Sequence, residues 1–167
     1  MYSIRPARPD DAPTLLRLIR ELAAYEREPD AVQATEASLR AQLEAASPPF
    51  ECRLGCVEGE PRAFALFFST YSTWRGRVGI WLEDLYVQPE FRGQGLGLRL
   101  FSEVARLARE RGAARLELCA LDWNTPAIRF YERLGARPMA EWTTYRLGDE
   151  AIDRLADLAP RPDPVDR

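Results

Sequence analysis

The chain has 167 residues, 46% of them hydrophobic, and a formal net charge of −3. These totals fit one compact domain with a sizeable core and give no general attraction to nucleic acid or to an anionic membrane. The sequence contains no histidine, which excludes an imidazole base, a Ser-His-Asp relay and a His-containing metal site.

The first half of the chain has the patterns of both helices and strands. Apolar side chains recur at helical spacing in the first helix, and Thr35 suits the N-cap of the second. A later hairpin is expected to turn at residues 58–61, and the strand after it is mostly apolar, which favours a central place in a sheet. The expected elements are a strand over residues 2–7, helices over 9–26 and 35–46, a hairpin over 50–72 and a strand over 76–87.

The second half alternates helices and strands. Gly112 and Gly135 mark helix ends, and Asn124 or Thr125 suits a helix cap. The expected elements are helices over 96–112 and 124–135, strands over 114–121 and 141–147, and a short helix over about 149–158. The order β-α-α-β-β-β-α-β-α-β indicates an α/β (α+β) fold. We expect a single domain over residues 1–158 and a disordered tail over 159–167.

The cysteines and the N-terminal stretch bear on the compartment. If the segment around Cys52 and Cys56 is a strand, these residues lie on one face, roughly 13 Å apart at about 3.3 Å per residue. This separation is too large for a disulfide, and free thiols fit a reducing cytoplasm. The stretch MYSIRPARPDD lacks the apolar run of a signal peptide. We therefore expect a cytoplasmic protein without a membrane partner.

Glycines occupy alternate positions between the strand that ends near Val87 and the next helix. Successive N–H groups at a helix N-terminus, with no Cβ in the way, form a cradle for an anion, and the helix dipole strengthens it. An arginine at the edge adds a cation. A pyrophosphate is the expected occupant, bound by Arg92, Gly93, Gln94, Gly95, Leu96, Gly97 and Leu98.

Other interpretations of this stretch are a turn without a ligand, a nucleotide loop or a dinucleotide loop. A glycine-rich turn has the same spacing. A Walker A loop is excluded, because no Gly-Lys-Ser/Thr follows. A dinucleotide fingerprint nearly fits, since Glu117 lies 20 residues after Gly97, but the spacing is not G-x-G-x-x-G. The remaining interpretation is the Arg-x-x-Gly-x-Gly loop of coenzyme A transferases.

Residues 92–97 resemble the acetyl-CoA loop of the GNAT N-acetyltransferase superfamily, and DWNTPAIRFYERLGA (122–136) resembles its second signature. IRPA, LLRLIRELAAYE and LEDLYV are similar, in order and spacing, to the diamine (spermidine/spermine) and thialysine acetyltransferase branch. The resemblance implies a mixed central sheet of about six to seven strands flanked by helices. It also implies acetyl-CoA as cofactor, no metal, a homodimer and direct transfer to a primary amine in a ternary complex.

The resemblance also implies roles for individual residues. Glu83 matches the general base proposed for the branch, and Tyr131 matches the acid that protonates the leaving thiolate. The strand before the loop is expected to splay at a bulge, which frees an N–H near Leu85 for the thioester carbonyl. The cofactor is expected to contact the strand backbone at Leu85, Tyr86 and Val87 and, later in the chain, Asn124, Pro126, Ala127 and Tyr131.

An acidic pocket is expected to hold a second amine of the substrate. Tyr25 and Glu26 match substrate contacts of the branch, and Glu28, Glu83, Asp84 and Glu117 are the other candidates. Glu83 and Asp84 are neighbours in a strand, so their side chains are expected on opposite faces. Acids at the end of the first helix oppose its dipole, which suggests a task other than helix stability.

Other functions are compatible with the same residues. The stretch Glu-Trp-Thr-Thr at residues 141–144 departs from the acidic run expected of a polyamine enzyme. The alternatives are acetylation of a protein N-terminus or lysine, and a non-catalytic module that binds coenzyme A. A covalent acyl-enzyme on Cys119 is disfavoured, because its strand is expected to be buried.

Overall fold

The computed structural model describes residues 1–159, so the predicted tail over 159–167 lies outside the described residues except for Ala159. Contacts divide the chain into two compact units, Met1–Cys119 and Ala120–Arg167. No helix in the described part of the chain has the length and hydropathy needed to cross a membrane.

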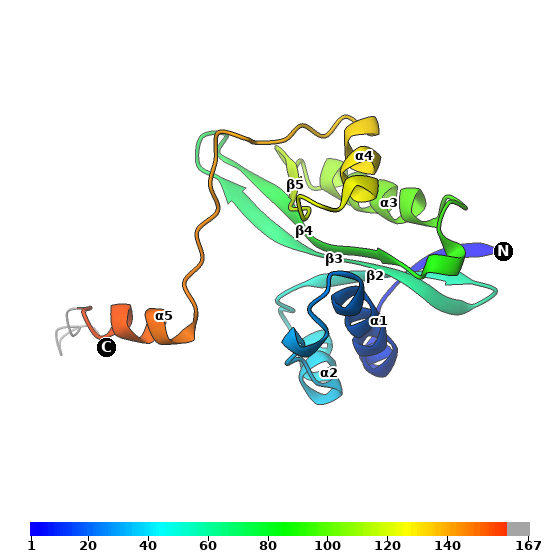
Figure 1. Cartoon of the computed structure of the whole chain (residues 1–167), viewed down its shortest axis with the longest axis horizontal. Coiled ribbons are helices and arrows are strands. Elements are labelled where there is room, and N and C mark those ends of the chain that lie inside the picture. The colour runs from blue at the N-terminus through cyan, green and yellow to red at the C-terminus, as the bar shows by residue number, and fades with distance from the viewer. Residues whose placement is uncertain (160–167) are drawn as a thin grey trace. The chain divides into compact units, whose positions relative to one another are not determined.

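The first unit is built on a mixed sheet in which strand order follows chain order (Figure 1). Neighbouring strands are antiparallel except for the last pair, which is parallel. The predicted mixed α/β class is therefore confirmed. Within residues 1–159 the sheet has five strands: β1 (Tyr2–Pro6), β2 (Glu51–Val57), β3 (Glu60–Ser72), β4 (Arg77–Val87) and β5 (Leu116–Leu118).

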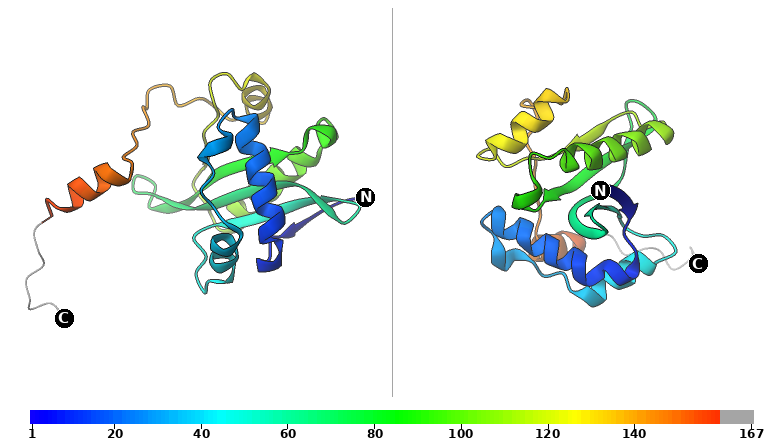
Figure 2. Two further views of the ribbon diagram at one scale, coloured as in Figure 1. Left: turned by 60° about the horizontal axis from the view of Figure 1, so that its bottom comes forward. Right: turned by 90° about the vertical axis from the view of Figure 1, so that its right-hand side faces the viewer.

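Helices cover both faces of this sheet (Figure 2). Helices α1 (Ala12–Tyr25) and α2 (Glu36–Glu44) lie on one face, and α3 (Leu96–Glu110) lies on the other. The α1 face has a continuous apolar core that includes Leu15 and Leu18 of α1 and Phe64 of β3. Three single-turn 3-10 helices complete the unit: η1 (Pro9–Asp11), η2 (Pro29–Ala31) and η3 (Pro89–Phe91).

A glycine in β2 lets α3 approach the sheet closely. A Cβ added at Gly55 would lie 3.0 Å from Leu96 Cδ1 and 3.1 Å from Leu100 Cδ1. Real Cβ atoms are rarely packed so tightly, so a side chain at this position would push the helix outward. Leu96 and Leu100 are both fully buried. The first turn of α3, which follows the glycine loop, is therefore anchored directly on the sheet.

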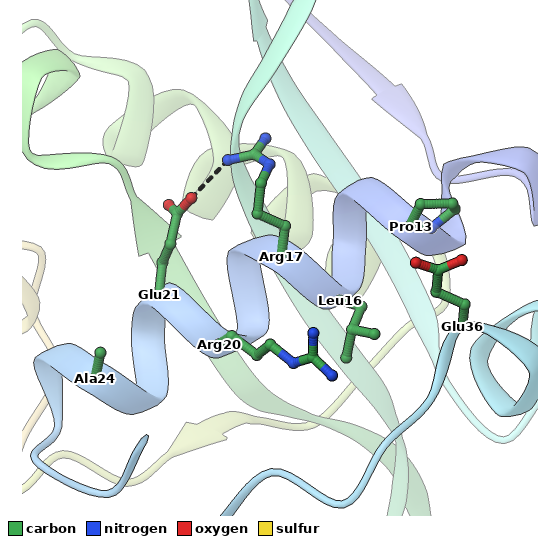
Figure 3. A pocket seen from close by; sticks show the side chains of 7 residues that line it. All are labelled: Pro13, Leu16, Arg17, Arg20, Glu21, Ala24 and Glu36. Atoms are coloured by element: carbon green, nitrogen blue, oxygen red, sulfur yellow. Dashed lines mark hydrogen bonds and ion pairs between the residues drawn. The ribbon is translucent and has the colours of Figure 1, made fainter. Parts of the chain in front are cut away.

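A shallow groove runs along the outside of α1 (Figure 3). An ion pair between Arg17 Nη1 and Glu21 Oε1, 2.6 Å long, lies at its edge. The lining contains none of the residues that the sequence predicts for cofactor or substrate. It consists of Pro13, Leu16, Arg17, Arg20, Glu21 and Ala24 of α1 and Glu36 of α2.

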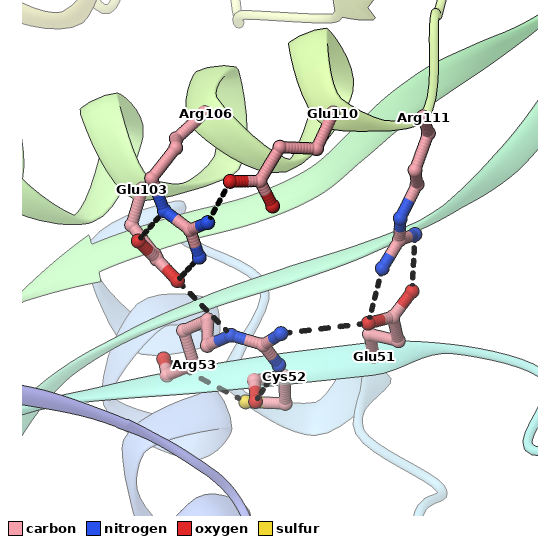
Figure 4. Close-up of polar contacts among 7 residues, drawn as sticks. All are labelled: Glu51, Cys52, Arg53, Glu103, Arg106, Glu110 and Arg111. Atoms are coloured by element: carbon pink, nitrogen blue, oxygen red, sulfur yellow. Dashed lines mark hydrogen bonds and ion pairs between the residues drawn. The ribbon is translucent and has the colours of Figure 1, made fainter.

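An ion-pair network joins the other end of α3 to β2 (Figure 4). Arg53 of β2 is its partly buried centre: its guanidinium lies 3.6 Å from Glu51, 3.7 Å from Glu103 and 5.6 Å from the centroid of the Phe67 ring. Exposed ion pairs contribute little stability, but one whose cation is mostly buried and stacked holds its geometry better. The remaining members are Arg106, Glu110 and Arg111.

The second unit contains the helices α4 (Thr125–Arg133) and α5 (Asp149–Ala156). The predicted strand over residues 141–147 is wrong, because these residues form no strand and no described strand pairs with them. The stretch has suitable β propensity, but propensity produces a strand only where a partner supplies the hydrogen bonds. The expected six to seven strands are corrected to five for the same reason.

Candidate active site

Strand β4 loses one of its neighbours before it ends. Ile80, Trp81 and Leu82 pair with β5, whereas the rest of β4, as far as Val87, pairs only with β3 among the described residues. The pairing stops before β4 ends, because β5 itself ends at Leu118. One edge of this segment offers backbone groups to a ligand, because the neighbouring strand no longer uses them.

A bulge lies where β4 loses this neighbour. Leu66 of β3 pairs with Asp84 and the next residue, Phe67, pairs with Leu82, so Glu83 is the extra residue. The expectation that Glu83 and Asp84 lie on opposite faces assumed strict alternation and is wrong, because the extra residue interrupts it. Asp84 shares the α1 face with its partner Leu66, which belongs to the core beneath α1.

Asp84 lies close enough to two other carboxylates at this bulge for their charges to act on it. Burial first, and then the charges of Glu83 and Glu26, together raise the pKa of Asp84 from 3.8 to about 7. Burial also raises the pKa of Glu26, which caps the C-terminal end of α1. The helix dipole there disfavours an anion. The group therefore favours a cation as its occupant.

Glu83 and Glu117, two further acidic residues predicted for the site, have different partners. Glu83 is exposed, and its Oε2 accepts a hydrogen bond from Trp81 Nε1 at 2.7 Å. Glu117 of β5 pairs with Arg115, whose Nε lies 2.7 Å from its Oε2. The charge of Glu117 does not contribute to the raised pKa of Asp84. The structure therefore groups Glu26, Glu83 and Asp84 and places Glu117 in a separate ion pair.

The glycine loop provides an open backbone surface before α3. Gly93 and Gly95 have φ angles of 73° and 85°, and a Cβ added at either would meet no atom within 4 Å. Positive φ favours glycine here, and the empty space beside it leaves room for a ligand. Gly95 is also the N-cap of α3, whose first turn carries no acidic side chain. These residues fit the pyrophosphate of acetyl-CoA.

The side chains around the loop are held by the protein itself. Arg92 Nε donates a 2.8 Å hydrogen bond to Val87 O. Gln94 Oε1 accepts from the Tyr2 hydroxyl at 2.5 Å, and its Nε2 donates to Glu90 O at 2.8 Å. Leu96 is buried, so only its backbone is available to a ligand, whereas Leu98 is exposed.

In β4 beside the loop, as at Leu96, a buried side chain leaves only the backbone available to a ligand. Tyr86 is buried, and its ring centroid lies 6.3 Å from that of Phe64. Its side chain therefore belongs to the core, and only its backbone can face a cofactor. Leu85 and Val87 are half-buried on the alternate positions.

The remaining predicted residues belong to the second unit. Asn124 caps α4, because its Oδ1 accepts from Ala127 N at 3.3 Å, and Pro126 occupies the first turn. The Tyr131 ring packs edge-on against Phe130, with centroids 5.2 Å apart. Cys119 was expected to be buried, but β5 ends at Leu118 and Cys119 is exposed.

Contacts that sequence reasoning missed join α1 to the end of β4. The Arg92 guanidinium lies 4.6 Å from the Tyr25 ring centroid, and Gln88 Nε2 donates to both carboxylate oxygens of Glu21. No sequence signal pairs these residues, because the two segments lie far apart in the chain. The Trp81–Glu83 bond could have been found, since i, i+2 spacing places two strand residues on one face.

The chain resembles known proteins over most of its length. Residues 15–136 match the model of the acetyltransferase (GNAT) family. The chain is 41% identical over 164 residues to a thialysine N-epsilon-acetyltransferase of Sus scrofa, covering 92% of this chain and 96% of the relative. It is 31% identical over 204 residues to an L-ornithine N5-acetyltransferase of Arabidopsis thaliana, covering 93% and 90%.

A solved structure supports the fold. An integron cassette protein of V. cholerae superposes with a TM-score of 0.77 at 23% identity, over 93% of this chain and 97% of that one. At this level of identity the likeness concerns the fold alone.

The raised pKa of Asp84 makes stability depend on pH. Between about pH 4 and pH 7 the unfolded chain has lost the Asp84 proton while the folded chain keeps it, so folding stability falls as pH rises through this window. Asp84→Asn removes this effect. We expect it to raise Tm by about 3 °C or more at pH 8 and to leave Tm nearly unchanged at pH 4. Differential scanning calorimetry measures both.

The exposed neighbour provides the control for this prediction. Glu83→Gln also removes a carboxylate charge, but this carboxylate is exposed. The substitution should therefore change Tm at pH 8 less than Asp84→Asn does. A pH-independent difference between Asp84→Asn and the unmodified protein would contradict the prediction, because it would indicate a change in packing.

Proposed function

The chain belongs to the GNAT acetyltransferase family, and from this premise we propose that it transfers the acetyl group of acetyl-CoA to a primary amine of a small molecule. The proposed acceptor is a diamine, a polyamine or a thialysine-like amino acid, and transfer is direct, in a ternary complex. The observation that carries the proposal is the free edge of β4, which runs from the carboxylates at the bulge to the open glycine loop. The relatives named for thialysine and L-ornithine support the choice of acceptor.

The cofactor is proposed to bind along β4 and the glycine loop. Acetyl-CoA supplies an activated thioester and a thiol leaving group. Backbone N–H groups from Gly93 to Leu98 hold the pyrophosphate, and Arg92 adds a cation at the edge. The backbone of Leu85 to Val87 lines the pantetheine arm, and an N–H near Leu85 stabilises the oxyanion. Asn124, Pro126, Ala127 and Tyr131 complete the contacts.

The proposed proton transfers involve one residue from each unit. Glu83 accepts the proton of the ammonium, directly or through water, and Tyr131 donates one to the leaving thiolate. This assignment rests on the proposal that residues 1–158 form a single catalytic domain, and residues 15–136, which match the family model, include both side chains.

The substrate pocket is proposed at the end of α1 and the bulge of β4. Tyr25, Glu26 and Asp84 hold a second, distal ammonium, and Glu83 lies beside the reacting amine. The raised pKa of both Glu26 and Asp84 supports a cationic ligand, since its charge would offset the burial of both carboxylates and the repulsion that Glu83 and Glu26 exert on Asp84. Glu117 stays a candidate that must first leave Arg115.

We further propose a cytoplasmic homodimer without a nucleic-acid or membrane partner. All three cysteines are free, as expected in a reducing compartment. Tyr71 and Trp74 are 61% and 87% exposed near the turn between β3 and β4, which supports this hairpin as a subunit contact. Sedimentation velocity tests the dimer.

The experiment that tests the activity is thiol release from acetyl-CoA across a panel of acceptors. The panel contains diamines, polyamines, thialysine, lysine, ornithine, an aminoglycoside and a peptide. Turnover of a small amine supports the proposal. Turnover of the peptide alone would favour acetylation of a protein N-terminus or lysine, and binding of acetyl-CoA without turnover would favour a non-catalytic module.

The glycine loop gives a prediction with a matched control. Gly95→Ala places a Cβ in the space proposed for the pyrophosphate and should weaken acetyl-CoA binding about tenfold, or about 1.4 kcal/mol, in calorimetry. Gly59→Ala, in the β2–β3 turn, introduces the same strain, because Gly59 has φ 89° and equally open surroundings. Both variants should lose about 1–2 kcal/mol of stability. Equal acetyl-CoA affinity in the two would show that the loop is only a turn.

The acid–base roles predict losses of turnover rather than of binding. Glu83→Gln should lower kcat about 10²–10⁴-fold, most strongly at low pH, where the amine gives up its proton least readily. Tyr131→Phe should lower kcat at unchanged acetyl-CoA affinity. Steady-state kinetics from pH 6 to 9 measures both. If both variants turn over like the unmodified enzyme, catalysis depends on positioning alone.

The distal ammonium predicts discrimination between substrates. A charge-assisted contact contributes roughly 1.5–3 kcal/mol, so a diamine should exceed a monoamine of equal length about tenfold or more in kcat/KM. Glu26→Ala should remove most of this preference without weakening acetyl-CoA binding. Glu28→Ala is the control, because Glu28 is exposed and lies only two residues further. Equal use of monoamine and diamine by the unmodified enzyme would exclude the pocket.

A further inference from the structure

The arginine of the glycine loop touches the residue that precedes the proposed substrate acid. The Arg92 Cζ lies 4.6 Å from the ring centroid of Tyr25 and 5.6 Å from that of Tyr86. Its Nε–H is used by Val87 O at 2.8 Å, which fixes the plane of the guanidinium. Tyr86 is buried against Phe64, so it is a rigid support. A planar cation held in this way keeps a flat contact with an aromatic ring.

A second contact, one helical turn earlier, joins the same two segments. Gln88 is 7% exposed, and its Nε2 donates to the two carboxylate oxygens of Glu21 at 3.1 and 2.9 Å. Its backbone N–H donates to Arg62 O, which fixes Gln88 on the sheet. Glu21 and Tyr25 are four residues apart on α1 and therefore share a face. The last turn of α1 is thus fastened to the segment from Tyr86 to Arg92 at two points.

We propose that Arg92 is a positioning residue for the amine site. It holds the Tyr25 ring and thereby fixes the end of α1, where Glu26 follows. This task is additional to that of a cation at the cofactor loop, and the inference rests on the proposed function. This positioning role makes recognition of the amine depend on a residue that the sequence motif assigns to the cofactor.

Lysine and arginine separate the two tasks of this residue. Lysine keeps the positive charge that a pyrophosphate would attract, but it has neither the planar face nor the Nε–H of arginine. Arg92→Lys should therefore spare the cofactor and release Tyr25. Arg99 supplies the control, because it also stacks on an aromatic ring, with its Cζ 5.9 Å from the Tyr2 centroid, but it belongs to α3, on the sheet face opposite α1.

The first measurement needs neither cofactor nor substrate. Hydrogen–deuterium exchange of the free protein reports the opening of the last turn of α1, where Glu26 N donates to Leu22 O. Arg92→Lys should speed exchange over residues 22–28 about fivefold or more and leave the start of α1 unchanged, since a cation–π contact of this kind contributes about 1 kcal/mol. Arg99→Lys should leave exchange over residues 22–28 unchanged. Unchanged exchange in Arg92→Lys would overturn the proposal.

The second measurement compares the effect of Arg92→Lys on KM for the amine with its effect on acetyl-CoA affinity. Arg92→Lys should raise KM for the amine about fivefold or more, while calorimetry finds acetyl-CoA affinity within about twofold of the unmodified enzyme. In a Tyr25→Leu background the same substitution should have little further effect, because the contact is already lost. Weakened acetyl-CoA binding with unchanged amine KM would sink the inference while leaving the proposed function intact. Failure of the proposed function itself would instead appear as unchanged acetyl-CoA affinity in Gly95→Ala.

Discussion

Strand β4 is hydrogen-bonded on both sides up to Leu82 and on one side from there to Val87, and each part of the candidate site depends on this change. A bulge at Glu83 marks the change and re-aims the side chains of the strand. The glycine loop begins a few residues later, on the same chain segment. The edge that β5 leaves free, the carboxylates and the loop are therefore consequences of one interruption in one strand.

The carboxylates at the bulge are held at a cost to the fold. Asp84 is mostly withdrawn from water and is close enough to Glu83 and Glu26 for their charges to act on it. Arginines elsewhere on the surface are used in other ways, as in the network around Arg53, which lies on the α3 side of the sheet. A cationic ligand would supply the charge that the protein itself withholds from this group. Unfavourable local electrostatics of this kind is typical of a functional site rather than of a structural one.

Sequence patterns predicted the elements whose causes are local. Helical spacing placed α1 and α3, and Thr35 does cap α2, since its side chain accepts from Ser38 N. The family resemblance is confirmed by the match over residues 15–136. The strand over residues 141–147 was predicted in error, because its pattern was right but a strand also requires a partner.

The features that the sequence did not predict depend on contacts between distant segments. The family resemblance implied a bulge in this strand, but alternation still placed Glu83 and Asp84 on opposite faces, because only the register of the two strands shows that Glu83 is the extra residue. The contact between Arg92 and Tyr25 joins the glycine loop to α1, and strands β2, β3 and β4 lie between these two segments in the chain. Motif spacing assigned Arg92 a ligand, whereas only the fold reveals what its side chain touches. Local causes were thus read correctly, and non-local ones were not.

The agreement between strand order and chain order has a consequence for the order in which the strands pair during folding. Strands β2, β3 and β4 are consecutive and antiparallel, so they can pair early through short turns, whereas β5 reaches β4 only after α3 has crossed the sheet. That last pairing is parallel and involves only Ile80, Trp81 and Leu82 of β4. A short pairing that requires a long loop to close is slow to form and easy to open. We therefore expect the contact made last in folding to border the free edge of β4, so that the opening that admits a ligand is also the least cooperative part of the sheet.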